Sequence, residues 1–505
     1  MGTGFTRRRF LRALGAGALI ALASGCGRNT ALRSALTPKS SPLRAPKVWP
    51  LPGVSPVLPK GVWAFRSRPD LAPAAAEVVG SASGTAPGYL FLALKEGAGE
   101  HGPMILDDRG QLVWFERYIT ARNFKVQRYR GRPVLTWWEG SVVFGHGVGE
   151  YVVFDDSYRE ISRVRAGNGF EGDLHEFLIT PQDTALITAY GAVSVDLSPA
   201  GGAEYGLAWD GMVQEIDIET GEVLFEWHSL DHTGVEEAYV APPANPSYVY
   251  DYFHINSIDV DHDDNLLVSA RNTWAVYKLE RKSGELLWRL GGKRSDFEMG
   301  EGTRTAFQHD ARRQEDGTIT IFDNGAHPTI HEQSRAIRLQ LDEEEMSATL
   351  LREYTSPEKI LSTSQGNAQL LPNGNVLVGW GSAPFVSEFS HDSRLLLNAA
   401  FPPECESYRA FRFPWSGHPT DAPALAARRR SKDRVALHAS WNGATEVAAW
   451  EVISGPHPNR LEPLGSVPRD GFETAMLAQT RDPYVAARAR NSSGEVLGTS
   501  TAVKL

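Results

Sequence analysis

Short apolar runs separated by turn residues recur along most of the chain. Within each unit, an apolar run is followed by an Asp/Asn-Gly-type turn, a second apolar run and a further hairpin. Asp264, Asp316 and Asn373 occupy equivalent turns and are spaced by 52 and 57 residues. A repeat of about 50 residues with four short strands per unit is typical of propeller blades.

Six such units can be followed, at about 89–118, 123–166, 174–230, 254–292, 308–355 and 365–402. The third unit contains an insertion from about 192 to 210, and 231–252 is a Pro- and Tyr-rich connection. Insertions of this kind tend to lie over one face of a propeller. The pattern therefore predicts an all-β fold with a six-bladed β-propeller over 61–420.

A different pattern begins near the C-terminus. Residues 421–432 are predicted to be a linker, and 433–505 form a new series of alternating strands. An early Trp and a late strand, Tyr484-Val485-Ala486-Ala487-Arg488-Ala489, resemble a fibronectin type III sandwich. The predicted fold is thus a propeller followed by a fibronectin type III-like β-sandwich.

The N-terminus predicts export. Arg7, Arg8 and Arg9 precede an apolar run that ends in Ala23-Ser24-Gly25-Cys26, so that 1–26 is typical of a twin-arginine lipoprotein signal. Residues 27–60 read as a flexible tether. We expect a cell-surface or extracellular protein anchored to the membrane by lipid on Cys26. Ala23 stands where Leu is more usual, so cleavage without lipidation is the alternative.

Composition narrows the possible partners. The 505 residues are 42% hydrophobic, which suits a large globular core, and the net charge of −10 argues against nucleic acid. The chain has two cysteines, Cys26 and Cys405. If Cys26 carries lipid, Cys405 has no partner for a disulfide within the chain.

Polar side chains cluster at equivalent places in the repeats. In a propeller the innermost strand of each blade lines a central channel, so residues at the starts of the units converge on one axis. The candidates at or near these positions are His175, His254, Asn256, Arg271, His309, Asn324 and Asn367. A single histidine at a strand start is usually a structural hydrogen-bonding residue, but three at equivalent positions favour a site. For Arg271 the alternative is an ion pair with Asp259 or Asp261.

Two chemistries suit three histidines and one arginine. Imidazoles bind zinc, copper or iron, which would make a metalloenzyme. Alternatively, Arg and imidazolium groups hold an anionic group while a neutral imidazole attacks it. An arginine beside a metal ion is electrostatically costly, which favours the second chemistry, although the residue types leave both open.

Three segments, 251–257, 269–271 and 307–311, resemble the arylsulfotransferase family of bacterial exported enzymes. The resemblance implies a six-bladed propeller that moves a sulfuryl group from an aryl sulfate donor to a phenolic acceptor, with no cofactor and no metal. It also implies that His309 forms a transient sulfohistidine in a ping-pong mechanism and that His254 and Arg271 bind the sulfuryl oxygens. His175 matches a further active-site histidine.

Other residues are expected to help bind the substrate. Asn256, Asn324 and Asn367 are candidates on the channel, and Trp274 and Tyr252 could stack on aromatic rings, with blade packing as their alternative role. The chain departs from known members of the family, because its sandwich follows the propeller and Asp310 stands where some relatives have Thr. The competing hypotheses are a non-catalytic exported propeller that binds a ligand or partner, and a His-ligated metalloenzyme.

Overall fold

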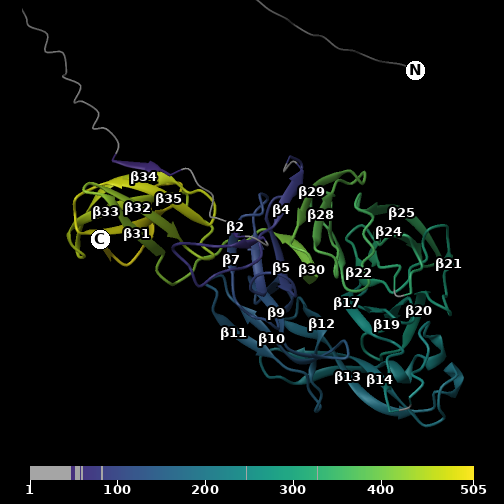
Figure 1. Cartoon of the computed structure of the whole chain (residues 1–505). Helices are drawn as coiled ribbons and strands as arrows, with labels where there is room; N and C mark the ends of the chain where they lie inside the picture. The colour runs from purple at the N-terminus through teal and green to yellow at the C-terminus, as the bar shows by residue number, and fades with distance from the viewer. Residues whose placement is uncertain (1–46, 52–56, 59–60, 81–82, 246, 327) are drawn as a thin grey trace, which may run out of the picture. The chain divides into compact units, whose positions relative to one another are not determined.

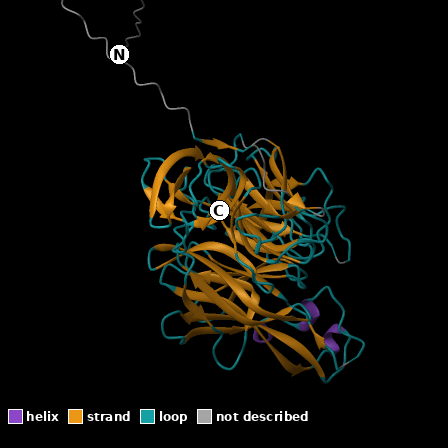
Figure 2. Cartoon of the chain, turned by 60° about the vertical axis from the view of Figure 1, so that its left-hand side comes forward, coloured by secondary structure: helices purple, strands orange, loops and turns teal. Residues whose placement is uncertain are grey.

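The computed structural model describes the chain except for residues 1–46, 52–56, 59–60, 81–82, 246 and 327. In the described part, regular structure is almost entirely strand, as predicted (Figure 2). Its helical segments are three 3-10 turns, η1 (Ser198–Ala200), η2 (Ser229–Asp231) and η3 (Val235–Glu237). No helix in these residues is both long and apolar enough to cross a membrane. The predicted export signal and Cys26 lie outside the described residues.

Five sheets carry the repeats (Figure 1). One sheet has the order β30 (Glu406–Phe413), β5 (Tyr89–Lys95), β6 (Gly102–Leu106), β7 (Leu112–Phe115). A nine-stranded sheet contains β8 (Arg122–Tyr129), β9 (Arg132–Val143), β10 (His146–Phe154), β11 (Glu160–Val164), β12 (Gly172–Ile179), β13 (Thr184–Val195), β14 (Gly206–Asp217), β15 (Val223–His228) and β16 (Val249–Tyr250). Its β8–β11 and β12–β15 groups join through one pair, Gly149 with Gly172.

The other three sheets follow in chain order. The first contains β17 (Ile255–Val260), β18 (Leu266–Ala270), β19 (Ala275–Leu279) and β20 (Leu286–Gly291). The second contains β22 (His309–Arg313), β23 (Ile319–Asp323), β24 (Arg335–Asp342) and β25 (Ser347–Thr355), with β21 (Glu298–Met299) beside β25. The third contains β26 (Asn367–Leu370), β27 (Val376–Gly379), β28 (Phe385–Phe389) and β29 (Leu395–Ala400), with β4 (Glu77–Gly80) beside β29.

The first strands of these groups form a closed ring. Within the described residues, β30 contacts β8, β8 contacts β12, β12 contacts β17, β17 contacts β22, β22 contacts β26, and β26 returns to β30. Adjacent strand groups pack through apolar side chains, for example Phe91 and Trp114 against Phe124 and Trp137. The arrangement is propeller-like, and it brings the starts of the repeats to one axis. The repeat pattern did not include β30, which completes the ring from the far end of the chain.

Two further sheets share the C-terminal core. One has the order β1 (Val48–Pro50), β35 (Glu473–Gln479), β32 (Arg434–Ser440), β31 (Ala424–Ser431). The other contains β34 (Arg460–Pro468), β33 (Ala449–His457), β36 (Tyr484–Arg490), β37 (Val496–Thr499) and β38 (Val503–Lys504). A separate two-stranded sheet pairs β2 (Val57–Leu58) with β3 (Val62–Trp63).

Two predicted irregular segments contain strands. β31 occupies most of the predicted linker 421–432, and its Arg-rich, half-exposed sequence pairs with β32 as an edge strand. β1 lies in the predicted tether 27–60 and pairs with β35. An edge strand needs little apolar alternation when a neighbouring strand supplies its hydrogen bonds, so the sequence pattern of both segments predicts irregular structure. Ala424–Ser431 and Val48–Pro50 are strands instead.

Candidate active site

A cavity of about 370 Å3 opens at one end of the strand ring. We call it the histidine pocket, and its lining is Lys95, Glu96, Arg122, Val142, Gly145, Leu174, His175, His254, Arg271, His309, Ser364, Gln365 and Tyr408. The structure thus brings together the four residues for which catalysis was predicted, His175, His254, Arg271 and His309. Every strand group of the ring contributes to the lining, because the pocket lies on the axis that they share.

Backbone irregularities aim these side chains at the axis. The register shifts in β12 between Asp173 and Phe177, in β17 after Ile255, and in β22 after His309. β8 and β30 show similar shifts. Such bulges redirect side chains that a regular ladder would place between strands. His254 has a φ of 62°, a left-handed conformation that is strained for a non-glycine residue and is often found at functional sites.

On three of the ring strands, one residue lines the pocket and the next one belongs to a buried network of ion pairs. His175, His309 and Tyr408 line the pocket, while the next residues, Glu176, Asp310 and Arg409, join a buried ion network. This network consists of Lys125, Glu176, Asp310, Arg312 and Arg409. Glu176 is fully buried and accepts hydrogen bonds from Lys125 at 2.8 Å, from Arg409 at 3.1 Å and from Arg312. The ion network therefore ties four ring strands together directly beside the pocket.

The hydrogen bonds of His309 define its tautomer. Nδ1 of His309 lies 2.7 Å from Oδ1 of Asn324 and 3.1 Å from the carbonyl of Phe307, which are both acceptors. Asn324 cannot present its NH2 group instead, because Nδ2 donates to the carbonyls of Ser362 and Gln365. On the other side of the ring, the N–H of Gln365 donates to Nε2 at 3.2 Å. His309 is thus held as the Nδ1–H tautomer with the lone pair on Nε2.

His309 is also kept neutral. Burial lowers the pKa of His309 well below its usual range, and the positive charge of Arg271 lowers it further. The side chain is 2% exposed, so water does little to stabilise an imidazolium at this place. A neutral imidazole with an unprotonated Nε2 is the form that can act as a nucleophile once a substrate displaces the hydrogen bond from Gln365.

Two of the pocket histidines are each bonded to a carboxylate. His175 Nδ1 donates to Asp173 Oδ2 at 2.5 Å, and His254 Nδ1 donates to Asp251 Oδ2 at 2.6 Å. The two rings meet edge to face with centroids 4.7 Å apart. A carboxylate on Nδ1 orients the ring and stabilises an imidazolium when Nε2 takes up a proton. Asp173 and Asp251 lie two and three residues before their histidines, but the repeat pattern does not single them out.

Arg271 supplies the positive charge of the pocket. Its backbone N–H donates to the carbonyl of His254 at 2.9 Å, and its guanidinium lies 5.4 Å from the ring centre of Phe307. Among the described residues, its Nε is buried without a hydrogen-bond partner. The alternative ion pair with Asp259 or Asp261 is wrong, because Asp261 pairs with Lys278 and Arg313 and Asp259 lies beside Arg312. Arg271 therefore has donors available for an anion.

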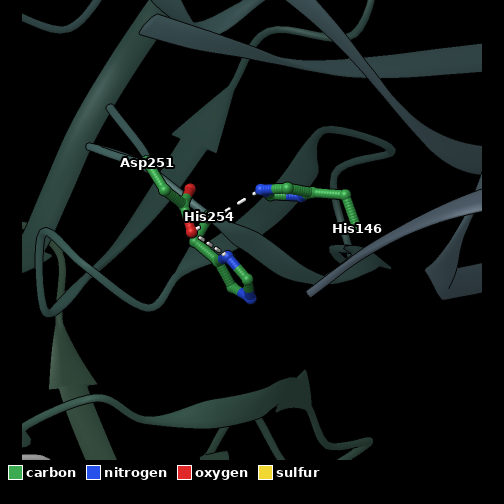
Figure 3. A group of neighbouring side chains, drawn as sticks. All are labelled: His146, Asp251 and His254. Atoms are coloured by element: carbon green, nitrogen blue, oxygen red, sulfur yellow. Dashed lines mark hydrogen bonds and ion pairs between the residues drawn. The ribbon is translucent and has the colours of Figure 1, made fainter. Parts of the chain in front are cut away.

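His146, which the repeat pattern does not predict as a site residue, lies beside this group. His146 begins β10 after the turn that follows β9, and its Nε2 is 3.6 Å from Asp251 Oδ2 (Figure 3). Figure 3 shows His146 and His254 approaching that oxygen from two sides. Burial lowers the pKa of His146 to about 4. The only sequence signal is Gly145-His146-Gly147 at a hairpin, outside the repeat-equivalent positions.

The other predicted binding residues lie in the frame of the site. Asn256 bridges the backbone of Gln308 and Asp310, and Asn367 exchanges two hydrogen bonds with Ala410. Asn324 orients His309. Tyr252 is fully buried in the core beside Phe253, and Trp274 stacks on Tyr239 with ring centres 3.6 Å apart. None of these five lines the histidine pocket among the described residues.

The family of the chain follows from a sequence comparison. Residues 125–402, more than half of the chain, match the family described as arylsulfotransferase (ASST). The chain belongs to the arylsulfotransferase family. At the level of the family this indicates an enzyme of sulfuryl transfer that uses small aryl sulfates and phenols. The matched segment carries His175, His254, Arg271 and His309, and also His146 and Asp251.

No curated protein matches this chain. Among solved structures, a protein of unknown function from Bacteroides caccae is 13% identical with a TM-score of 0.40, over 65% of this chain and 100% of that one. A protein of unknown function from Dyadobacter fermentans is 12% identical with a TM-score of 0.33, over 78% and 100%. A virginiamycin B lyase from Staphylococcus aureus is 9% identical with a TM-score of 0.30, over 71% and 94%. With TM-scores of 0.40 or less, these likenesses do not indicate the activity of this chain.

Proposed function

We propose that the chain is an arylsulfate sulfotransferase that works by a ping-pong mechanism through a sulfohistidine at His309. The donor is an aryl sulfate and the acceptor is a phenol. The observation that carries this proposal is the tautomer of His309, whose Nδ1–H is engaged by Asn324 while Nε2 keeps its lone pair at the pocket. Family membership supports the same chemistry.

In the first half-reaction, Nε2 of His309 attacks the sulfur of the donor. The N–S bond forms as the S–O bond to the donor phenol breaks, and the electron pair leaves with the phenolate. Arg271 stabilises the negative charge on the sulfuryl oxygens and on the departing phenolate. The Nδ1 proton of His309 stays in its hydrogen bond to Asn324, so the adduct is an N-sulfonated imidazolium whose Nδ1–H still donates to the amide oxygen.

In the second half-reaction, the acceptor phenol takes the sulfuryl group from His309. Its proton passes to an Nε2 of a neutral pocket histidine, and the paired carboxylate stabilises the imidazolium that results. His175 and His254 both have this geometry, because Asp173 and Asp251 accept their Nδ1–H groups. The acceptor oxygen then attacks sulfur as the N–S bond breaks, which restores neutral His309. The pocket histidine gives its proton to solvent, or to the phenolate released in the first half-reaction, and returns to its neutral form.

The test is incubation of purified protein with p-nitrophenyl sulfate, with and without phenol. We expect release of p-nitrophenolate, a burst without acceptor, and a mass gain of one sulfuryl group on the peptide that contains His309. His309→Asn should lose the burst and the adduct while its far-UV circular dichroism is unchanged. Turnover that persists undiminished in His309→Asn would exclude His309 as the nucleophile. A folded protein without any turnover would favour a binding propeller.

We further propose that the strand ring is a six-bladed propeller in which β30 closes the blade of β5–β7. The ring of contacts and the six strand groups support this count. The two C-terminal sheets, which pack around the buried Trp450, support a fibronectin type III-like sandwich. A crystal structure with a different blade number or strand order would contradict these proposals.

We also propose export by the twin-arginine route and a lipid anchor at Cys26, on the sequence pattern of residues 1–26. The double variant Arg7→Lys, Arg8→Lys should keep the protein in the cytoplasm. Cys26→Ser should release the exported protein from the membrane fraction. Unchanged membrane association of Cys26→Ser would exclude lipidation at this residue.

A further inference from the structure

We propose that His146, Asp251 and His254 form a site for one divalent transition-metal ion at the edge of the histidine pocket. The three ligand atoms are His146 Nε2, Asp251 Oδ2 and His254 Nδ1, and they all lie within 4.8 Å of one another (Figure 3). Two imidazole nitrogens and one carboxylate oxygen are a common ligand set for zinc and iron. The inference goes beyond the proposed sulfuryl transfer.

The first observation in favour is the state of His146. Its ring is 3% exposed, yet among the described residues neither Nδ1 nor Nε2 has a hydrogen-bond partner. Buried polar groups without a partner are costly and usually indicate a missing water, ion or ligand. Oδ1 of Asp251 is likewise buried without a hydrogen bond in the described structure. The other oxygen of Asp251, Oδ2, is the one that faces His146 Nε2 at 3.6 Å (Figure 3).

The second observation is the charge around His254. Asp251 and Asp173 carry two negative charges behind His254 and His175, against the one positive charge of Arg271. A divalent ion bound by Asp251 would be attracted by this local negative charge, which offsets the cost of placing a metal near Arg271.

Metal binding needs only small shifts of the ligands. Metal–nitrogen and metal–oxygen bonds of about 2.0–2.2 Å place tetrahedral ligands about 3.5 Å apart. His254 and Asp251 are 2.6 Å apart because they share a proton, and His146 and Asp251 are 3.6 Å apart. An ion that replaces the shared proton would leave His254 with Nε2–H, a permanent donor toward the pocket. His175, paired with Asp173, would then be the histidine that carries the proton of the acceptor phenol.

The experiment measures metal directly and does not depend on turnover. Protein stripped with a chelator is titrated with Zn2+ by calorimetry, and Co2+ is added to a separate sample to record its visible d–d absorption. We expect one equivalent of Zn2+, a tetrahedral-type Co2+ spectrum, and a rise in melting temperature with Zn2+. His146→Gln and Asp251→Asn should each lose at least tenfold in affinity for Zn2+.

His228→Gln is the matched control, because His228 also lies 2.6 Å from a carboxylate but has no second histidine in its cluster among the described residues. It should bind Zn2+ as the wild type does. Absence of stoichiometric Zn2+ and Co2+ binding by the wild type would overturn the site, even if a variant failed to fold. Unchanged affinity in folded His146→Gln would overturn it as well. Sulfuryl transfer by a metal-free protein would leave the proposed function intact.

Discussion

The hydrogen bond between His309 and Asn324 determines which nitrogen of the His309 ring carries the proton. Nδ1 of His309 and Oδ1 of Asn324 are 2.7 Å apart, and two backbone carbonyls prevent the Asn324 amide from turning over. Because this bond keeps the proton on Nδ1, the lone pair of the imidazole is on Nε2, the nitrogen that would attack the substrate.

Asn324→Ala should lower kcat for p-nitrophenyl sulfate by roughly 10- to 100-fold, as loss of a partner that orients a histidine commonly does. KM should change little, because Asn324 does not line the pocket. The 15N chemical shifts of labelled His309 should show a mixture of tautomers. Asn375→Ala is the control, since Asn375 is a buried amide bonded to Gly84 and Glu388, away from the pocket. A wild-type tautomer and kcat in Asn324→Ala would contradict this role.

The acid limit of the reaction should lie below the ordinary pKa of histidine. The pKa of His309 is lowered by burial and by Arg271, so the neutral nucleophile persists as the pH falls through 6.5 and is lost only at lower pH. The rate of the p-nitrophenolate burst should therefore stay nearly constant from neutral pH to below 6. Arg271→Met should move the acid limb upward. A limb centred at or above 6.5 in the wild type would show that His309 is not in this environment.

The repeat pattern was enough to predict which residues share an axis. His175, His254 and His309 stand at equivalent unit starts, and propeller geometry then requires that they converge. The pattern could not show how each ring is oriented, because this depends on bulges and on partners such as Asp173 and Asn324. Those partners are ordinary polar residues in the sequence.

His146 could not be predicted as a site residue from the repeat pattern. It lies at the turn of the hairpin between β9 and β10, away from the unit starts that the repeat pattern aligns. Tyr408 was missed for a related reason, since β30 comes from beyond the last predicted unit and closes the ring through long-range contacts. The repeat pattern also predicts Asn256 and Asn367 on the axis, but their side-chain amides form hydrogen bonds with the backbone of neighbouring strands.

Glu176→Gln should destabilise the protein by about 3–5 kcal/mol, because removing one partner leaves buried charges uncompensated. Burial alone would raise the pKa of Glu176, but Arg312, Arg409 and Lys125 hold it well below its usual range. Denaturant unfolding followed by fluorescence measures the loss. In the control, Glu219→Gln, the exposed pair with Arg130 should contribute less than about 1 kcal/mol. Equal effects of the two variants would show that the ion network does not stabilise the ring.

Arg271→Lys tests whether the pocket needs the shape of a guanidinium or only its charge. A guanidinium offers several donors in a fixed plane and can bond two oxygens of a sulfuryl group, whereas an ammonium acts as a point charge. Among the described residues, the buried Nε of Arg271 has no hydrogen-bond partner. The backbone N–H of Arg271 donates to the carbonyl of His254, and its guanidinium lies over the ring of Phe307. We therefore expect kcat/KM for p-nitrophenyl sulfate to fall by about 100-fold in Arg271→Lys, the scale for loss of one oxyanion donor. Arg122→Lys is the matched control, because Arg122 also lines the pocket but donates to the carbonyls of Ile119 and Ala121. A large loss in Arg122→Lys together with a small one in Arg271→Lys would place the anion at the rim instead of beside His309.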